Sequence, residues 1–327
     1  MEKQKKKVSI IIPVKAINDY IRESVPKILE LDWEDFEIII FPDKEDKENS
    51  WPKTRIIPSG KAGPAEKRDL ALKYATGEFL AFLDDDAYPE PTWLKKAMIH
   101  FDDEKIAAVG GPAKTPRNNG VLQKVSGAVF ESYLGGGATR HRYLPIGKSR
   151  KIDDWPTVNL LVRRDVFEQV GGFDNTYWPG EDTKLCLDIN NAGHDIIYNP
   201  EAIVYHHRRS DLLKHFKQIG NYALHRGYFA KIYPKTSRKF FYFVPSLFDF
   251  YLILLVLLLL FSNSRTLYIY SIPLAIYLLM LLADGIVVSV RWLNPLVGMI
   301  SMPMILFTHI WYGIRFVWGL ILPKLDR

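Results

Sequence analysis

Three consecutive aspartates, Asp84 to Asp86, follow directly after the apolar stretch EFLAFL. Adjacent carboxylates repel one another unless a cation compensates their charge. Hard oxygen ligands of this kind suit Mg or Mn, and a shell that is left open can be completed by a substrate diphosphate. The run therefore predicts a metal site, with a solvated turn as the alternative.

A second acidic pair, Glu181 and Asp182, stands in the sequence GGFDNTYWPGEDTKLCLDI. Leu185 and Ile189 form one apolar face of a helix, so both acids are expected in its first turn. Taken alone, the pair is explained by the helix dipole, which favours acids at this end. Together with a metal and diphosphate site, it provides a carboxylate that can take a proton from a hydroxyl, as displacement of a nucleoside diphosphate requires.

The elements that must position these acids alternate between strand and helix. The stretch VSIIIPV reads as a buried strand that ends at Pro13, a helix is expected from Asp19 to Leu31, and FEIIIF reads as a second strand before Asp43. A short strand TRIIPS, a turn at residues 60–63 and a helix over 65–74 lead to EFLAFL. This order predicts a parallel sheet, whose strands bind ligands at their carboxyl ends. No GxGxxG follows the first strand, so a dinucleotide-binding domain lacks its fingerprint.

The N-terminal two thirds of the chain resembles the glycosyltransferase family 2 proteins of GT-A fold, especially bacterial and archaeal enzymes of surface-glycan assembly. The motifs that carry the resemblance are IIPV at 11–14, Lys67-Arg68-Asp69, FLDDDAYPEPTWL at 82–94, GGFD at 171–174 and GED at 180–182. The resemblance implies an α/β, Rossmann-like domain that binds a nucleotide-diphosphate sugar and transfers the sugar with inversion.

The resemblance also implies roles for individual residues. Asp84 and Asp86 match the DxD motif, and Asp182 matches the catalytic base, with Glu181 beside it. The expected metal ligands are Asp86, Asp84 and, as a further candidate, His206 in AIVYHH. The candidates for binding the nucleotide sugar are Pro13, Val14, Asp43, Lys61, Arg68, Asp84, Asp85, Arg140 and Arg142.

Several of these assignments have alternatives. Arg140, His141 and Arg142 form either a clamp on the leaving diphosphate, a lid, or simply a mobile basic loop. Of His206 and His207, at least one is expected to be a hydrogen-bonded structural histidine. Asp43 stands in FPDKED instead of the family's usual acidic-Gly-Ser turn, which weakens its assignment to the nucleobase pocket.

Processive synthases of the family carry QxxRW after the base motif. Here Gln218 is followed by Ile, Gly, Asn221 and Tyr222, so Arg and Trp are both missing. We therefore expect transfer of one sugar.

The basic residues point to a membrane surface instead of nucleic acid. The formal charge is +6, yet nine Lys or Arg and only one acid, Asp211, fall between Arg208 and Lys239. This is the placement of a cytoplasmic collar before a membrane span, and a solvated helix face is the alternative. A single cysteine, Cys186, excludes an intramolecular disulfide and fits a reducing compartment.

Three apolar segments follow the collar: Val244 to Phe261, Leu267 to Val290 and Leu296 to Leu322. Each is long enough to cross a bilayer as a helix. Asp249 and Asp284 are expected near the cytosolic boundary, where they either face protein or snorkel. The second half of the third segment is amphipathic, so that segment spans the bilayer, which we slightly favour, or lies at its surface.

The sequence thus predicts a cytosolic GT-A domain at 1–236, with a basic juxtamembrane segment at 206–239, and a membrane domain of two to three helices at 237–327. The expected function is metal-dependent (Mn or Mg), inverting transfer of one sugar to a lipid-linked, polyprenyl-type acceptor at the cell membrane. The alternatives are direct transfer to polyprenyl phosphate and, in another class, a non-catalytic scaffold that binds sugar nucleotides.

Overall fold

A computed structural model describes residues 6–174, 176–261 and 264–325 of the chain. Its contacts divide the chain into two compact units. The first, here called the α/β unit, comprises residues 1–114 and 141–207, and the second, the helical unit, comprises 115–140 and 208–326. The chain therefore changes unit at 114, 140 and 207, whereas the domain boundary at 236 stays a prediction from the sequence.

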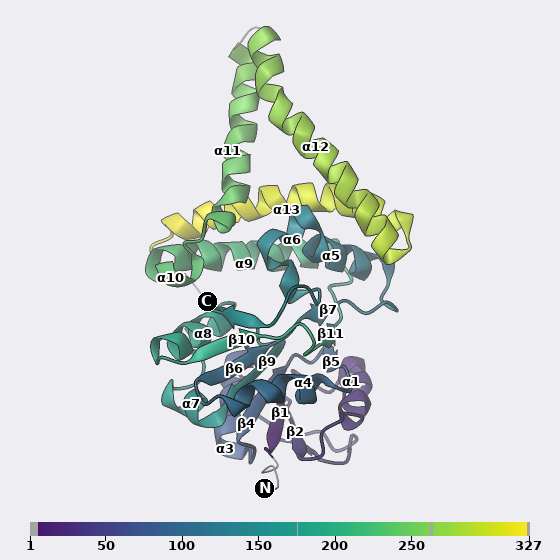
Figure 1. The fold of residues 1–327 in the computed structure, drawn as a ribbon, viewed down its shortest axis with the longest axis vertical. Coiled ribbons are helices and arrows are strands. Elements are labelled where there is room, and N and C mark those ends of the chain that lie inside the picture. The colour runs from purple at the N-terminus through teal and green to yellow at the C-terminus, as the bar shows by residue number, and fades with distance from the viewer. Residues whose placement is uncertain (1–5, 175, 262–263, 326–327) are drawn as a thin grey trace. The chain divides into compact units, whose positions relative to one another are not determined.

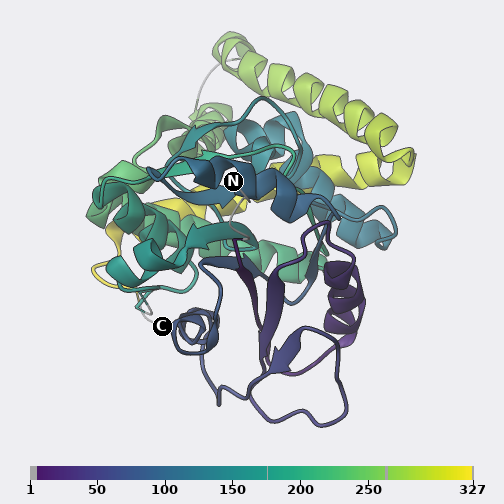
Figure 2. The ribbon, with the colours of Figure 1, turned by 60° about the horizontal axis from the view of Figure 1, so that its bottom comes forward.

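The α/β unit is built on an eight-stranded sheet (Figures 1 and 2). Strands β1 to β4 are parallel, β9 runs antiparallel between β4 and β6, and β10 is parallel to β6. The predicted parallel strands are confirmed. In sheet order the strands are β3 (Thr54–Ile56), β2 (Phe36–Phe41), β1 (Val8–Pro13), β4 (Phe79–Leu83), β9 (Asn159–Arg163), β6 (Ile106–Gly110), β10 (Asp195–Tyr198) and β8 (Arg150–Ile152).

Helices cover both faces of this sheet because successive strand residues point to opposite sides. Ile10 and Ile12 of β1 pack in one core with α1 and α4, whereas Ile11 packs in the other with α2, α3, α7 and α8. The expected helix over 65–74 consists of two short helices, α2 and α3. The helices are α1 (Asp19–Leu29), α2 (Pro64–Asp69), α3 (Ala71–Tyr74), α4 (Trp93–Met98), α7 (Arg164–Gln169) and α8 (Glu181–Asn191), with a 3-10 turn at Ile99–Asp102.

A small second sheet lies beyond the end of β4. It consists of β5 (Ala87–Pro89), β11 (Val204–His206) and β7 (Ala113–Lys114), with β11 in the middle. The antiparallel pairing of β11 with β5 sets His206 opposite Ala87. A histidine from late in the chain is thereby placed beside the aspartate run.

The helical unit contains the apolar C-terminal segments. Phe240–Phe261, Arg265–Trp292 and Pro295–Ile321 are long and apolar enough to cross a membrane, so the three predicted hydrophobic segments are confirmed as helices. The helices of the unit are α5 (Val121–Glu131), α6 (Tyr133–Gly136), α9 (Leu212–Ile232), α10 (Pro234–Ser237), α11 (Phe240–Phe261), α12 (Ser264–Trp292) and α13 (Pro295–Ile321), and a 3-10 turn spans Gly137–Arg142.

Helix α13 runs alongside α9 and crosses the ends of α11 and α12 (Figure 1). Trp311 Nε1 of α13 donates to the carbonyl of Phe216 at 2.9 Å, and Arg315 Nε donates to that of Gly220 at 3.3 Å. At Gly319 the backbones are so close that a Cβ would lie 2.0 Å from the Leu224 carbonyl oxygen. The third apolar segment therefore packs against the basic helix α9 over its second half.

Candidate active site

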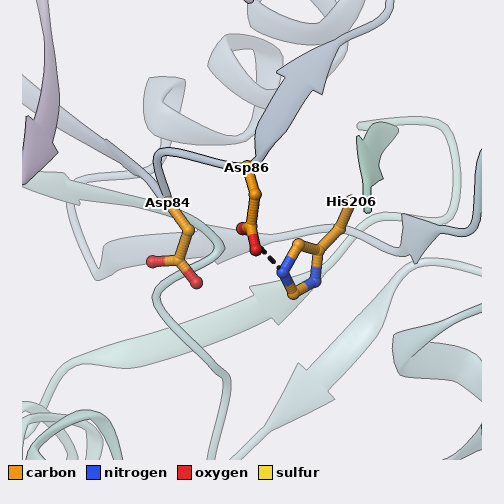
Figure 3. A group of neighbouring side chains, drawn as sticks. All are labelled: Asp84, Asp86 and His206. Carbon is orange, nitrogen blue, oxygen red and sulfur yellow. Dashed lines mark ion pairs between the residues drawn. The ribbon is translucent and has the colours of Figure 1, made fainter. Parts of the chain in front are cut away.

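The first and third aspartates of the run lie together with His206 at the carboxyl end of β4 (Figure 3). Asp86 Oδ1 is 2.9 Å from His206 Nε2, and one potential ligand atom from each of Asp84, Asp86 and His206 lies within 4.8 Å of the others. Asp86 and His206 are each only 8% exposed. Two carboxylates and an imidazole at this spacing can share one divalent cation, so the predicted ligands are brought together.

The middle aspartate, Asp85, interacts with a different element. Asn18, the N-cap residue of α1, donates its amide to Asp85 Oδ2 at 2.7 Å. Burial, followed by the charge of Asp86, raises the pKa of Asp85 to about 6. Its contact with the start of α1 distinguishes Asp85 from its two neighbours.

A buried arginine joins the two acidic motifs. Arg68 on α2 donates to Asp84 Oδ1 at 2.7 Å and to Glu181 Oε1 at 3.2 Å, although Glu181 lies 113 residues further along the chain. Its side chain is 5% exposed. The remaining Nε of Arg68 is buried and has no hydrogen-bond partner among the described residues. The contact of Arg68 with the nucleotide stays a prediction, and the structure shows that Arg68 joins the end of β4 to the start of α8.

The second acidic motif begins at Gly180, whose φ of +123° favours glycine. Glu181 and Asp182 follow in the first turn of α8 as predicted. Glu181 is 6% exposed and accepts the backbone N–H of Gly180 at 3.0 Å. Burial, followed by the charge of Asp182, raises the pKa of Glu181 to about 7 against the opposing effect of Arg68. Asp182 is partly exposed, so of the two acids it is the more accessible to a substrate.

The candidates for the nucleobase pocket are connected by Lys67. Its ammonium donates to the carbonyl of Val14 at 2.6 Å and forms an ion pair with Asp43. Lys67 lowers the pKa of Asp43. The side chain of Lys67 is only 4% exposed, and the sequence analysis missed it as a site residue, although it stands in the motif beside Arg68. Lys67 thus links the carboxyl ends of β1 and β2, next to Pro13.

The other basic residues that the sequence analysis predicted, Lys61, Arg140 and Arg142, interact with separate partners. Lys61 is exposed and acts on Asp43 through its charge. Arg142 forms an ion pair with buried Asp154 at 3.0 Å. Arg140 belongs to the helical unit, where it stacks on Tyr133 and donates to the Glu131 carbonyl at 2.8 Å. A diphosphate clamp of Arg140 and Arg142 therefore stays a prediction.

His206 pairs with Asp86, whereas His207 contacts helix α1. Its Nε2 lies 3.0 Å from Glu23 Oε2 of α1, and its backbone N–H donates to the Asp86 carbonyl at 2.9 Å. Burial lowers the pKa of His207 and outweighs the charge of Glu23, which raises it. We expected at least one of the two histidines to be a hydrogen-bonded structural histidine, and His207 is such a residue.

Comparison with known proteins places this architecture in a family. The mixed α/β sheet is typical of proteins with the GT-A fold. Residues 9–171 match the profile described as Glycosyl transferase family 2. The chain carries a domain of this family, as the motifs predicted.

Two relatives and one solved structure are also similar to this chain. The pre-mycofactocin glycosyltransferase of Mycobacterium tuberculosis is 32% identical over 154 residues, which are 46% of this chain and 31% of that protein. A Methanococcus voltae protein named dolichyl N-acetyl-alpha-D-glucosaminyl phosphate 3-beta-D-2,3-diacetamido-2,3-dideoxy-beta-D-glucuronosyltransferase is 23% identical over 96% of this chain and 97% of its own. A mannosyltransferase from Pyrobaculum calidifontis, solved with GDP-Man and Mn2+, aligns with TM-score 0.56 at 17% identity over 98% of this chain and 88% of its own. The match to the Mycobacterium relative spans about a third of that protein's length.

Proposed function

We propose that the protein transfers one sugar, with inversion, from a nucleoside-diphosphate sugar to a lipid-linked acceptor at a membrane surface. The observation that carries the proposal is the bridge made by Arg68. It joins Asp84 at the end of β4 to Glu181 at the start of α8. A candidate cation site and a candidate base therefore belong to one site, as displacement of a nucleoside diphosphate requires.

The donor set of Asp84, Asp86 and His206 fits a divalent cation. Carboxylates suit both Mg and Mn, but an imidazole ligand suits a first-row transition metal better than Mg. We therefore propose Mn before Mg. Bound there, the cation would neutralise charge on the leaving diphosphate.

Asp182 is the proposed base and Glu181 its positioning neighbour. Asp182 is partly exposed in the first turn of α8. Glu181 is buried against Arg68, so it fixes the start of the helix and is less available to a hydroxyl. In this arrangement Asp182 accepts the acceptor's hydroxyl proton while the oxygen attacks the anomeric carbon, and inversion follows from that single displacement.

The lipid-linked acceptor is supported by the apolar helices and by the relatives. The Methanococcus voltae protein, which aligns along nearly its whole length, is named for a sugar carried on dolichyl phosphate. Of the three apolar helices, α11 and α12 are less buried than α13. The basic segment at 208–239 favours a cytosolic position for the polar part of the chain.

Helix α13 is proposed to lie at the membrane surface, in place of the slightly favoured span. Its second half packs on α9 through Trp311 and Arg315. Helix α9 carries three lysines and one arginine, which are costly to place in hydrocarbon. Cysteines introduced at Leu293 and Pro323, in a Cys186→Ser background, test this. Labelling of both from the same side of sealed vesicles supports a surface helix, whereas labelling from opposite sides shows a span.

A transfer assay tests the function itself. The full chain in detergent is supplied with Mn, a panel of UDP, GDP and dTDP sugars, and either polyprenyl phosphate or a polyprenyl-linked sugar. Asp182→Asn should abolish transfer, while Asp188→Asn, two turns along α8 and paired with Lys184, should retain it.

The two acceptors in this assay distinguish the proposed function from its alternatives. Transfer to the lipid-linked sugar supports the proposal, and transfer to polyprenyl phosphate alone replaces it by the direct reaction. Nucleotide-sugar binding without transfer or hydrolysis in any arm would establish the scaffold instead.

A further inference from the structure

A hollow of about 370 Å³ lies between helices α9 and α13 of the helical unit. The two helices run side by side (Figure 1). The lining of the hollow combines two cations, an amide and apolar side chains, and it includes Leu213, Lys217, Gly220 and Asn221 of α9 and Trp311 and Arg315 of α13. Positive charge and apolar surface are therefore brought together in one place.

Hydrogen bonds to the backbone of α9 fix one wall of this hollow. A Cβ at Gly220 would lie 2.4 Å from Trp311 Nε1, so glycine is what lets the indole lie against α9. The indole donates to the Phe216 carbonyl at 2.9 Å, and Arg315 Nε donates to the Gly220 carbonyl at 3.3 Å. The tryptophan and the arginine are thus held in defined positions at the hollow.

The two cations of the hollow are not neutralised by an acid. The guanidinium carbon of Arg315 lies 5.7 Å from the ring centre of Trp311 and 5.5 Å from that of Trp318. The terminal amino groups of Arg315 and the ammonium of Lys217 have no hydrogen-bond or ion-pair partner among the described residues. Both cations are therefore available to a ligand in the hollow.

The acids nearest to these helices are directed elsewhere. Neither α9 nor α13 contains Asp or Glu. Asp211 is the N-cap of α9, where it accepts the backbone N–H of Leu213 at 2.7 Å. Asp249 of α11 lies beside Gly313, which is two residues from Arg315 and so about 200° away around the axis of α13. The charge balance in the hollow therefore favours an anion.

One face of α13 beside the hollow is apolar and exposed. Phe307, Trp311, Ile314, Trp318 and Ile321 follow one another at intervals of four, three, four and three residues, which place them on one face of a helix. Between 39% and 74% of each residue is exposed. On a helix at a membrane surface, such a face is buried among acyl chains. Trp311 belongs both to this face and to the hollow, so the two are adjacent.

We propose that the hollow binds the phosphate headgroup of an anionic phospholipid, whose acyl chains lie along the apolar face of α13. Arg315 and Lys217 bind the phosphate oxygens through charge-assisted hydrogen bonds, and the partly exposed Asn221 can add an amide donor. The apolar face assigns the anion to a lipid, because a free phosphate would make no contact with it.

This assignment goes beyond the proposed function. It concerns how the chain is held at the bilayer and is independent of which sugar is transferred. It takes from the proposed function only the position of α13 at the membrane surface.

Isothermal titration of the full chain in neutral detergent with dioctanoyl phosphatidylglycerol tests the assignment. Loss of one charge-assisted contact corresponds to about tenfold weaker binding, so we expect about that change for Arg315→Gln and for Lys217→Gln. The matched control is Lys214→Gln, which removes an exposed lysine of α9 that does not line the hollow. Thermal unfolding of each variant verifies the fold, and the exposed Lys217 keeps the test valid if Arg315→Gln is unstable.

The other ligands in this assay identify what is recognised. Dioctanoyl phosphatidylcholine and dioctanoylglycerol should bind more weakly than phosphatidylglycerol and should be insensitive to Arg315→Gln. Equal binding of either would show an apolar groove without headgroup recognition and overturn the assignment. Inorganic phosphate that binds as tightly as phosphatidylglycerol, or farnesyl phosphate that binds more tightly, would overturn it in favour of a free anion or of the isoprenoid carrier. Equal loss of binding in Lys214→Gln would overturn it in favour of diffuse attraction to the basic helix.

Failure of this assignment is distinguishable from failure of the proposed function, because the binding assay contains no sugar donor. If sugar is transferred but the Arg315 and Lys217 variants bind phosphatidylglycerol like the wild type, the lipid site is wrong and the function stands. If these variants lose phosphatidylglycerol but no sugar is transferred to any acceptor, the lipid site stands and the function is wrong.

Discussion

The two units differ in how they arrange charged side chains. In the α/β unit one arginine, Arg68, is shared by Asp84 and Glu181, and Asp86 and Asp182 stand beside those acids in the chain. In the helical unit Arg117, Arg208 and Arg291 act through their charge on the buried carboxylate of Glu131. Buried charges are costly unless compensated, so an excess of one sign predicts the sign of the ligand. The acid-rich site therefore suits a cation that carries a diphosphate.

Two acids in the apolar helices of the helical unit differ in the hydrogen bonds that their carboxylates accept. Asp284 accepts two backbone N–H groups. The carboxylate oxygens of Asp249 on α11 are buried beside Gly313 and have no hydrogen-bond partner among the described residues. Two acids that look alike in the apolar sequence therefore differ in what they stabilise.

The largest expected effect comes from removing the more buried of the two candidate aspartate ligands, Asp86. Asp86→Asn should lower the rate of sugar transfer by about a thousandfold or more, because several kcal/mol of charge stabilisation on the diphosphate are lost. Mn binding, followed by electron paramagnetic resonance, should weaken in parallel. Asp19→Asn, at a fully exposed carboxylate on α1, is the control. Unchanged Mn binding in Asp86→Asn would remove this aspartate from the cation site.

Arg68 is expected to have the next largest effect, on stability. Arg68→Met leaves Glu181 and Asp84 without their shared cation and should destabilise the protein by about 3–5 kcal/mol, measured by denaturant unfolding followed through tryptophan fluorescence. Adding Glu181→Gln should restore part of that loss, since the uncompensated buried charge is then removed. Arg22→Met, which breaks an exposed ion pair with Asp19, should cost less than about 1 kcal/mol. Equal losses in the two variants would contradict the bridging role.

In the helical unit the two membrane-segment acids should respond differently. Asp284→Ala leaves the N–H groups of Tyr133 and Leu134 unpaired and should cost about 1.5–3 kcal/mol, seen as a lower unfolding temperature in detergent. Asp249→Asn removes a buried charge that has no hydrogen-bond partner among the described residues, so it should be neutral or stabilising. The reverse order of the two variants would show that Asp249 is the acid that supports the fold.

The smallest expected effect concerns an acid that lies outside the candidate site. Burial alone would raise the pKa of Glu37, but hydrogen bonds from Ser9, Thr76 and Arg55 outweigh it and lower the pKa to about 2. A lowered pKa in the folded state stabilises the protein above the unfolded value near 4.5, and this contribution disappears as the pH falls from there toward 2. Its size at neutral pH is about 1–2 kcal/mol after allowance for solvent screening.

Acid titration of unfolding for the wild type and Glu37→Gln measures this contribution. The variant should be less stable at neutral pH and should converge with the wild type near pH 2. Glu45→Gln, at an exposed carboxylate, should follow the wild-type curve throughout. Parallel curves for Glu37→Gln and the wild type would contradict the lowered pKa.

Local patterns in the sequence already determined much of this protein. The alternating apolar strands, the aspartate run after EFLAFL, the GED motif at a helix start and the three apolar helices depend on neighbouring residues, because side-chain direction and burial follow the period of the element. These features predicted the α/β fold, the candidate cation ligands and the family.

The tertiary structure decided which of these residues meet. The bridge from Arg68 to Glu181 spans 113 residues, His206 reaches Asp86 through the pairing of β11 with β5, and Lys67 links the ends of two strands. The cluster of Arg117, Arg208 and Arg291 likewise forms from three separate segments. No local period encodes such contacts, because they depend on sheet order and on the packing of helices that are distant in the chain.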